Sequence, residues 1–180
     1  MTNRAFPRHA ESVVAVEAPP EQLFELLDDH SRLSAHMTRR SWMMGGGRMV
    51  TATDERHGRE VGSHIVISGR VFGVRLALDE VVVERERARR KVWETVGDPR
   101  LLVIGSYRMG FEIDADGPRS RLRVFIEYAL PQHGVSRLLG RLLGSWYARW
   151  CTRRMTADAV RMFGPRSTRA EWHGASVFGG

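Results

Sequence analysis

Residues 134–163 read GVSRLLGRLLGSWYARWCTRRMTADAVRMF, and this stretch predicts one long helix near the end of a chain of 180 residues. Gly164 and Pro165 follow its last apolar residue, and a glycine followed by a proline is a strong helix stop. At about 1.5 Å of rise per residue, the helix would be roughly 40 Å long. Because several alternating segments precede it, we expect a sheet that wraps around this helix.

The apolar residues of the helix change sides along its length. In 135–150 they form an arc too wide for one contact seam, whereas those of 155–162 lie on roughly the opposite side at about 100° per residue. A bend near 151–154, or a second packing partner, would reconcile the two halves. Four large residues of the first half are expected to face the sheet: Leu139, Leu142, Leu143 and Trp146.

Alternation of apolar and polar residues predicts an antiparallel sheet before the helix. The pattern is clearest in 106–113 and 121–128, as in a sheet packed on one face and wet on the other. Pro19-Pro20-Glu21 opens a short helix after the first strand, Leu33 and Met37 indicate a second, and Gly97-Asp98-Pro99 predicts a turn. The seven expected strands are 9–17, 49–56, 64–70, 76–84, 91–96, 106–113 and 121–128.

The basic residues are almost all arginine. The formal net charge is +7, and Lys91 is the only lysine. Arg119, Arg121 and Arg123 alternate with apolar residues, so we expect them to point to solvent from the outer face of the sheet. A nucleic-acid groove is less favoured, because no aromatic residue interleaves with these arginines before Phe125 and single-strand binders need stacking platforms.

Cys151 is the only cysteine, so an internal disulfide is excluded and a reducing cytoplasm fits. On an apolar helix a free cysteine usually packs as a small hydrophobe. The sequence has no run of about 18 apolar residues and no apolar core of a signal peptide at its start. These features, together with the arginine bias, predict a soluble cytoplasmic protein of bacterial origin.

Residues that would face inward from the sheet are candidates for contact with a bound molecule. The alternative is that they fill a solid core. A buried tyrosine hydroxyl needs a partner, either in the protein or on a ligand, and our hypothesis is that at least one of Tyr107 and Tyr128 meets a ligand. The candidate contacts are Trp93, Tyr107, Met109, Phe111, Leu122, Val124, Ile126 and Tyr128, with Leu139, Leu142, Leu143 and Trp146 from the helix.

His64 lies on a predicted strand with apolar neighbours and could act as a general acid or base. A surface or structural histidine is the alternative. The spacings of His30 and His36, and of His57 and His64, do not place two ligands on one helix turn, and no cysteine pair accompanies them. We expect neither a metal site nor a cofactor.

The order of elements resembles the helix-grip fold of the SRPBCC superfamily, which includes START-like lipid carriers and polyketide cyclase/dehydrase relatives. The residues that carry the resemblance are HAESVVAVEA at 9–18, PPEQLFELLD at 19–28 and DEVVVE at 79–84, with the strand pair before the last helix. The resemblance implies a cavity between a curved sheet and the last helix that binds lipids, quinones, polyketides or other apolar molecules. It carries over no set of catalytic residues.

We therefore expect one α+β domain over 9–163, with a tail at 1–8 and a mobile tail at 164–180. Its sheet would have about seven antiparallel strands and would be followed by the long helix. The first hypothesis is binding of a small apolar or aromatic ligand. The second is a cyclase-like enzyme in which Tyr107, Tyr128 or His64 moves protons. The third is an interaction module whose arginine-rich outer face binds an acidic partner or a membrane surface.

Overall fold

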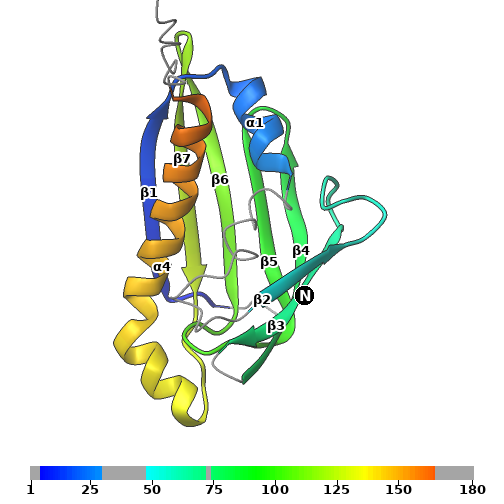
Figure 1. The fold of residues 1–180 in the computed structure, drawn as a ribbon, viewed down its shortest axis with the longest axis vertical. Coiled ribbons are helices and arrows are strands. Elements are labelled where there is room, and N and C mark those ends of the chain that lie inside the picture. The colour runs from blue at the N-terminus through cyan, green and yellow to red at the C-terminus, as the bar shows by residue number, and fades with distance from the viewer. Residues whose placement is uncertain (1–4, 30–47, 72–73, 165–180) are drawn as a thin grey trace, which may run out of the picture.

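The computed structural model describes residues 5–29, 48–71 and 74–164. Seven strands form one antiparallel sheet in the order β1-β7-β6-β5-β4-β3-β2, and the long helix α4 lies against it (Figure 1). This is the helix-grip architecture that the sequence predicts. The strands are β1 Arg8–Val16, β2 Arg48–Thr53, β3 His64–Val71, β4 Val74–Glu86, β5 Arg90–Arg100, β6 Tyr107–Asp116 and β7 Arg119–Tyr128; the helices are α1 Pro20–Asp28 and α4 Gly134–Phe163. The second short helix and most of both predicted tails fall outside the described residues.

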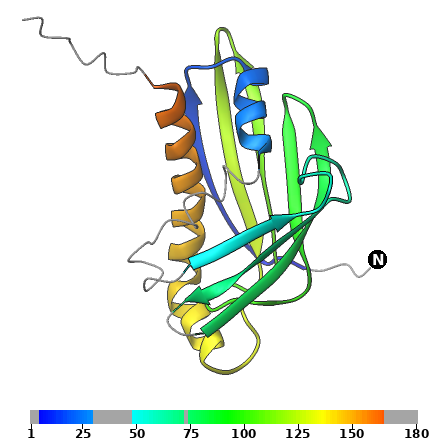
Figure 2. The same cartoon turned by 45° about the vertical axis from the view of Figure 1, so that its right-hand side comes forward.

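The sheet is curved, and irregular pairing between β4 and β5 contributes to the curvature. The register shifts between Ala77 and Asp79 and again between Val82 and Glu84. Such bulges bend a strand and increase its twist. Figure 2 shows β2 and β3 running obliquely beneath the longer strands toward the first turns of α4, so that the sheet partly encloses the space beside the helix.

The predicted turn at residues 97–99 is wrong, because these residues continue β5. Ala77 pairs with Arg100 and Asp79 pairs with Val96, so three residues of β5 lie opposite one residue of β4. Gly97 adopts a positive φ of 65°, which a glycine tolerates. Pro99 has no backbone N–H, and within the bulge it does not need to donate a hydrogen bond to the neighbouring strand.

Small residues form the face of α4 that packs on the sheet. Its buried positions are Gly140, Gly144, Ala148, Thr152, Met155, Thr156 and Ala159. A Cβ atom on Gly140 would lie 2.7 Å from Pro131 Cδ and 2.9 Å from the carbonyl oxygen of Val103. The helix backbone therefore approaches its neighbours more closely than any larger residue would allow, and it packs mainly on β1 and β7.

The expected orientation of the first half of α4 is consequently wrong. Leu142 is 68% exposed, Leu143 43% and Trp146 49%, and Leu139 is only partly buried. The apolar periodicity located the bulkiest side of the helix, but close packing on β1 and β7 selects the side with the smallest residues. One stripe along the helix faces the sheet: Met155 and Ala159 of the second half lie on the same side as Gly140 and Gly144, whereas the large apolar residues of the first half lie on the exposed side.

The short helix predicted after the first strand is present as α1, and it covers one end of the sheet (Figure 1). Leu23, Phe24 and Leu27 are buried, and the Phe24 ring meets Phe111 edge-on at a centroid distance of 5.7 Å. At the end of the helix, the ammonium of Lys91 donates to Asp28 Oδ1 and to the Asp28 carbonyl oxygen, both at 2.8 Å. This buried ion pair fastens α1 to β5.

Candidate functional site

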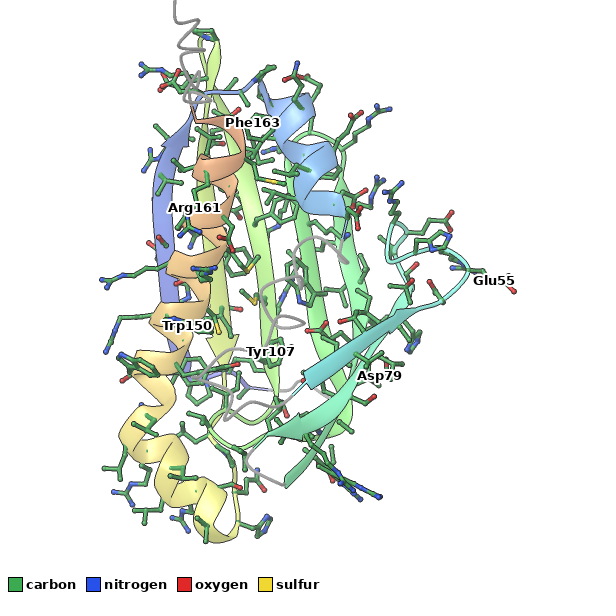
Figure 3. All side chains as sticks on the ribbon, in the orientation of Figure 1. Glu55, Asp79, Tyr107, Trp150, Arg161 and Phe163 are labelled. Carbon is green, nitrogen blue, oxygen red and sulfur yellow. The ribbon has the colours of Figure 1, made fainter. Side chains whose placement is uncertain are left out.

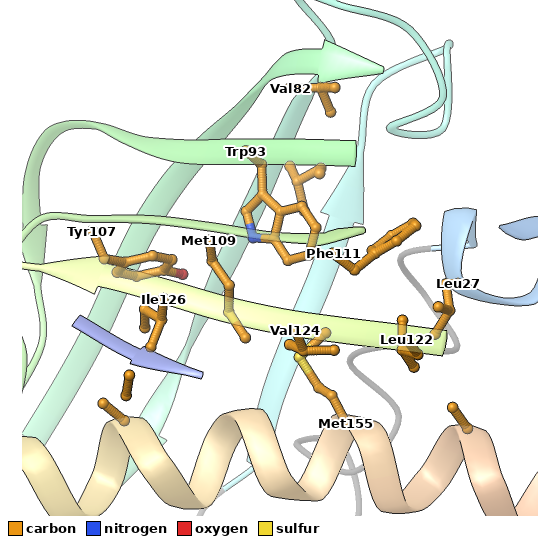
Figure 4. Close-up of a cluster of buried hydrophobic side chains, with 14 of the residues drawn as sticks. Leu27, Val82, Trp93, Tyr107, Met109, Phe111, Leu122, Val124, Ile126 and Met155 are labelled. Atoms are coloured by element: carbon orange, nitrogen blue, oxygen red, sulfur yellow. The ribbon is translucent and has the colours of Figure 1, made fainter. Parts of the chain in front are cut away.

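Burial along the inner face of the sheet is graded from one end to the other. Near α1, Phe111, Leu122 and Val124 have no exposed surface, as in a solid core (Figure 4). Toward the opposite end, Tyr107 keeps 8% of its surface exposed and Met109 keeps 7%. Leu76 and Leu78 of β4 keep similar fractions. The small residual exposure is confined to β6 and β4, because Tyr128 and Ile126, the β7 partners of Tyr107 and Met109, are each 1% exposed.

A group of polar side chains lies on this otherwise apolar face. Glu80 on β4 is paired in register with Thr95 on β5, and both are buried. The Tyr107 hydroxyl donates a hydrogen bond to Glu80 Oε1. The Thr95 hydroxyl accepts from the Tyr107 backbone N–H at 3.1 Å. Three neighbouring strands thus place a carboxylate, a hydroxyl and a phenol together.

Helix α4 contributes two further groups beside Tyr107. Burial raises the pKa of the Cys151 thiol to about 12, although a hydrogen bond with Tyr147 opposes this shift. The charge that Cys151 would carry as a thiolate, together with burial, raises the pKa of Tyr147 well above its ordinary value. The Tyr147 ring stacks on Trp150 at a centroid distance of 6.0 Å. We call Glu80, Thr95, Tyr107, Tyr147 and Cys151 the inner polar cluster.

The chemistry open to the inner polar cluster follows from these protonation states. Burial raises the pKa of Tyr107 well above its ordinary value, and the neighbouring Glu80 adds to the shift. Tyr107 is therefore a neutral phenol at physiological pH, and its proton is engaged by Glu80. The phenol oxygen keeps lone pairs that could accept a hydrogen bond from another molecule.

All eight candidate residues of the sheet are buried in the core that the inner face forms with the helices. Tyr128 is 1% exposed, and its ring lies close to Gly144 of α4. The helix candidates Leu142, Leu143 and Trp146 do not join this set, because they point away from the sheet. Contact of the inner residues with a ligand remains a prediction.

His64 does not belong to the inner face. Its side chain is 50% exposed, and its Nδ1 atom lies 3.0 Å from both carboxylate oxygens of Asp79. The buried neighbours Ile65 and Ile67 point to the opposite face of the same strand. His64 therefore cannot reach a molecule held against the inner face, and its expected acid–base role there is wrong.

Sequence reasoning missed Glu80, Thr95, Tyr147 and Cys151 as members of the cluster. A signal for Glu80 was present, because it occupies an inward position of β4 between Leu78 and Val82. An acidic residue on the apolar face of a strand is costly to bury unless it has a hydrogen-bonding or charged partner. Within the described ranges, no group of three or more His, Cys, Asp or Glu residues could hold a metal ion.

The outer face of the sheet carries paired charges. Arg123 binds Glu11 and Glu112, each at 2.7 Å, and Arg90 binds Glu84 at 2.7 Å. Both guanidiniums lie over the ring of Phe125, at 5.2 and 5.6 Å from its centroid. The prediction of a polar, solvent-facing arginine surface is confirmed for this part of the sheet. Because Phe125 is covered and the arginines are paired, a stacking platform for nucleic acid is not available there.

None of the helices in the described part of the chain combines the length and the apolar character needed to cross a membrane.

Comparisons with known proteins place this arrangement in context. The family described as "Polyketide cyclase / dehydrase and lipid transport" matches residues 7–162. No curated protein matches the chain. Among solved structures, the Zhui aromatase/cyclase from Streptomyces sp. R1128 is 14% identical with a TM-score of 0.58, and the match covers 86% of this chain and 94% of that one.

Two further structures are similar to the chain. A point mutant of norcoclaurine synthase from Thalictrum flavum, in complex with a transition-state analogue, is 8% identical with a TM-score of 0.61, covering 87% of this chain and 93% of that one. A protein from Thermobifida fusca is 17% identical with a TM-score of 0.59, with the same coverage of both chains. At these identities the likeness shows the helix-grip fold alone.

Proposed function

The chain belongs to the polyketide cyclase/dehydrase and lipid-transport family, an SRPBCC-type family, and from this we propose that it binds one small apolar or aromatic molecule between the inner face of the sheet and α4. The observation that carries the proposal is the graded burial of the inner face. Phe111, Leu122 and Val124 are completely covered near α1, whereas Tyr107 and Met109 of β6 keep 8% and 7% of their surface accessible. A ligand would lie at this less covered end.

The composition of this end suits an amphipathic ligand with one polar group. Met109 and Trp93 supply apolar surface, and a methionine side chain adapts to ligands of irregular shape. Tyr107 supplies the polar contact. Because its proton is already donated to Glu80, the phenol oxygen would act as the acceptor. The favoured ligand therefore carries a hydroxyl or phenol group that donates a hydrogen bond to Tyr107.

A second candidate function is catalysis of proton transfer on the same ligand, and the presence of a buried carboxylate next to Tyr107 favours it. The raised pKa of Tyr107 makes this residue a poor base. An acid–base reaction would therefore require Glu80 to accept the proton. Binding without reaction comes first, because the Tyr107 hydroxyl already has a protein partner.

The first experiment is native mass spectrometry of the purified protein, followed by organic extraction and identification of anything bound. A stoichiometric apolar molecule supports the proposal, and incubating it with the empty protein tests for turnover. An empty protein that shows no thermal shift across hydroxylated aromatics, quinones and lipids would contradict it.

Substitution of Tyr107 then tests the position of the ligand. Tyr107→Phe removes only the hydroxyl, and a neutral hydrogen bond contributes about 1 kcal/mol, so the dissociation constant for a hydroxylated ligand should rise roughly fivefold. An analogue without the hydroxyl should bind both proteins equally. The control is His64→Ala on the outer face, which should leave both affinities unchanged. Equal effects of the two substitutions would place the ligand elsewhere.

A further inference from the structure

The outer side of the first half of α4 exposes a row of large apolar side chains. Five of them lie within twelve residues, and at least 43% of the surface of each is exposed. Contiguous apolar surface on a folded protein usually marks a site of interaction. We call these residues the outer stripe: Val135, Leu138, Leu142, Leu143 and Trp146.

The charges around the outer stripe have one sign. Residues 134–157 contain five arginines and no aspartate or glutamate. Arg137, Arg141, Arg149 and Arg153 are exposed, and none of them forms a salt bridge with any residue that the structure describes. On the outer sheet face, by contrast, Arg123 and Arg90 are held by carboxylates. Four arginines without a carboxylate partner among the described residues thus share one helix with the outer stripe.

A shallow hollow of about 280 Å³ lies on this side of the helix. Its lining combines two indole rings with three guanidiniums: Trp146, Arg149, Trp150, Arg153, Arg154 and Ala157. Guanidiniums bind phosphate oxygens in a bidentate manner, and tryptophan favours the boundary between apolar and wet surroundings. The hollow therefore provides the two kinds of group that a phospholipid head and its glycerol region would contact.

We propose that the outer stripe and its arginines bind the surface of an anionic phospholipid bilayer, with α4 lying parallel to that surface. The apolar side chains would enter the boundary between head groups and acyl chains, and the arginines would bind lipid phosphates. Figure 3 shows side chains of this half of α4 projecting away from the sheet, with Trp150 at about the level of Tyr107. The membrane-bound half of the helix is thus next to the Tyr107 end of the inner face.

Charge decides between a lipid surface and a second copy of this chain. Two outer stripes packed against each other would bring ten arginines together without any carboxylate from residues 134–157. An anionic bilayer satisfies both features, because it offers negative charge and apolar depth in one surface. Nucleic acid would satisfy the arginines but would leave the exposed leucines in water.

The test is flotation of the full chain with vesicles of phosphatidylcholine alone and of phosphatidylcholine with 30% phosphatidylglycerol. Each arginine near an anionic surface strengthens binding about fivefold, so four of them predict a preference of at least a hundredfold for the anionic vesicles. Arg137→Gln/Arg141→Gln should weaken binding about 25-fold. Arg119→Gln/Arg121→Gln removes the same charge from the outer sheet face and should change it less than threefold.

A second variant, Leu142→Gln, leaves the charge unchanged and should weaken binding to anionic vesicles at both 50 mM and 300 mM salt. These substitutions are at exposed positions, so circular dichroism and the melting temperature should match the parent protein. Equal loss in both arginine pairs, or no preference for anionic vesicles, would overturn the proposal. So would a stable dimer in light scattering that Leu142→Gln dissociates, or binding to a DNA duplex that exceeds binding to the vesicles. The outcome does not depend on the ligand of the inner face.

Discussion

Asp28→Asn should destabilise the fold more than Lys91→Met, although both substitutions remove one member of the same buried ion pair. The Lys91 side chain has no exposed surface, and its ammonium lies 2.8 Å from Asp28 Oδ1. Asp28 has a second partner, since Arg85 donates to its carboxylate through Nη2 at 2.8 Å and Nε at 3.2 Å. Losing the lysine leaves the carboxylate paired with Arg85, whereas Asp28→Asn leaves the ammonium with neutral acceptors alone, the backbone carbonyl and the amide oxygen.

The two costs can be estimated from these contacts. Removing Lys91 loses hydrogen bonds to a charged group, which contribute about 1.5–3 kcal/mol. Removing the charge of Asp28 leaves a buried cation uncompensated, which typically costs about 3–5 kcal/mol. The upper limit is the free energy of deprotonating the lysine at pH 7 from its ordinary pKa of 10.5, about 5 kcal/mol. The two ranges meet at about 3 kcal/mol and their midpoints differ by about 2 kcal/mol, so we expect Asp28→Asn to be the more destabilising change by about 2 kcal/mol.

The pH dependence distinguishes this account from a simple loss of packing. Burial lowers the pKa of Lys91 even while Asp28 opposes the shift, so the asparagine variant should have a still lower folded-state pKa. Between that value and 10.5, the unfolded chain binds more protons than the folded protein. Stability relative to the parent should therefore rise with pH, by at most about 1.4 kcal/mol per unit, until the pH reaches the folded-state pKa of Lys91 in the parent, above which both proteins gain equally. The double variant Asp28→Asn/Lys91→Met has no lysine to titrate, so its stability should not rise with pH in this way.

The acid side has the opposite sign in the parent protein. Burial alone would raise the pKa of Asp28, but hydrogen bonds from Arg85 and Lys91 hold it below its ordinary value of 3.8. The stabilisation is complete above that value and is lost as the pH falls through the folded-state pKa. The asparagine variant should lose no stability from this position in acid.

The assay is urea denaturation, followed by tryptophan fluorescence, of the four proteins at pH 3 to 10. Because Lys91 is the only lysine, a sample with labelled lysine gives one side-chain resonance whose titration reports its pKa directly. The reasoning is refuted if Lys91→Met is the more destabilising change, or if Asp28→Asn gains nothing relative to the parent between pH 8 and pH 10.

Two further predictions concern Gly110 and Cys151. Gly110→Ala should destabilise the fold by about 2 kcal/mol or more, because the added Cβ would lie 2.6 Å from the backbone oxygen of Lys91. Gly117→Ala should cost about 1 kcal/mol, because its Cβ would lie in open space but its backbone has a positive φ of 61°. Urea denaturation measures both, and the reverse order would contradict the packing argument. Because burial raises the pKa of Cys151 to about 12, its thiol should react with a disulfide reagent at pH 8 roughly a thousandfold more slowly than a free cysteine. The rate should still increase about tenfold per unit from pH 8 to pH 10; rapid labelling at pH 8 would show that the thiol is accessible and ionised.

Period-two patterns made most of the sheet predictable. The pairing of β6 with β7, from Tyr107 opposite Tyr128 to Asp116 opposite Arg119, follows from alternating residues around a glycine turn. Glycine and proline were less reliable as turn signals, because within β5 they form a bulge and not a turn. The bulge opposite Leu78 absorbs residues 97–99 through long-range pairing, which local turn preferences do not contain.

Strand alternation predicted the inner-face position of the apolar candidates and of Tyr107, whereas Glu80, Thr95, Tyr147 and Cys151 were missed. Tyr107 and Tyr128 were placed on the inner face by strand alternation. The orientation of α4 was not accessible from apolar periodicity, because the contact depends on how closely Gly140 and Gly144 approach the chain before the helix. That distance is a property of the assembled fold. Cys151 joined the cluster for the same reason, since its neighbours depend on which side of α4 faces β7.

The position of β1 beside β7 has a consequence for the order of events during synthesis. Arg8–Val16 pairs with Arg119–Tyr128, so among the described strands the neighbour of the first strand comes more than a hundred residues later in the chain. Helix α4 then packs on β1 and β7 together. As the chain leaves the ribosome, β1 must wait unpaired while the hairpins from β2 to β6 form locally. Closure of so long a loop is slow, so one edge of the sheet and the surface on which the long helix packs are completed only after β7 has been synthesised.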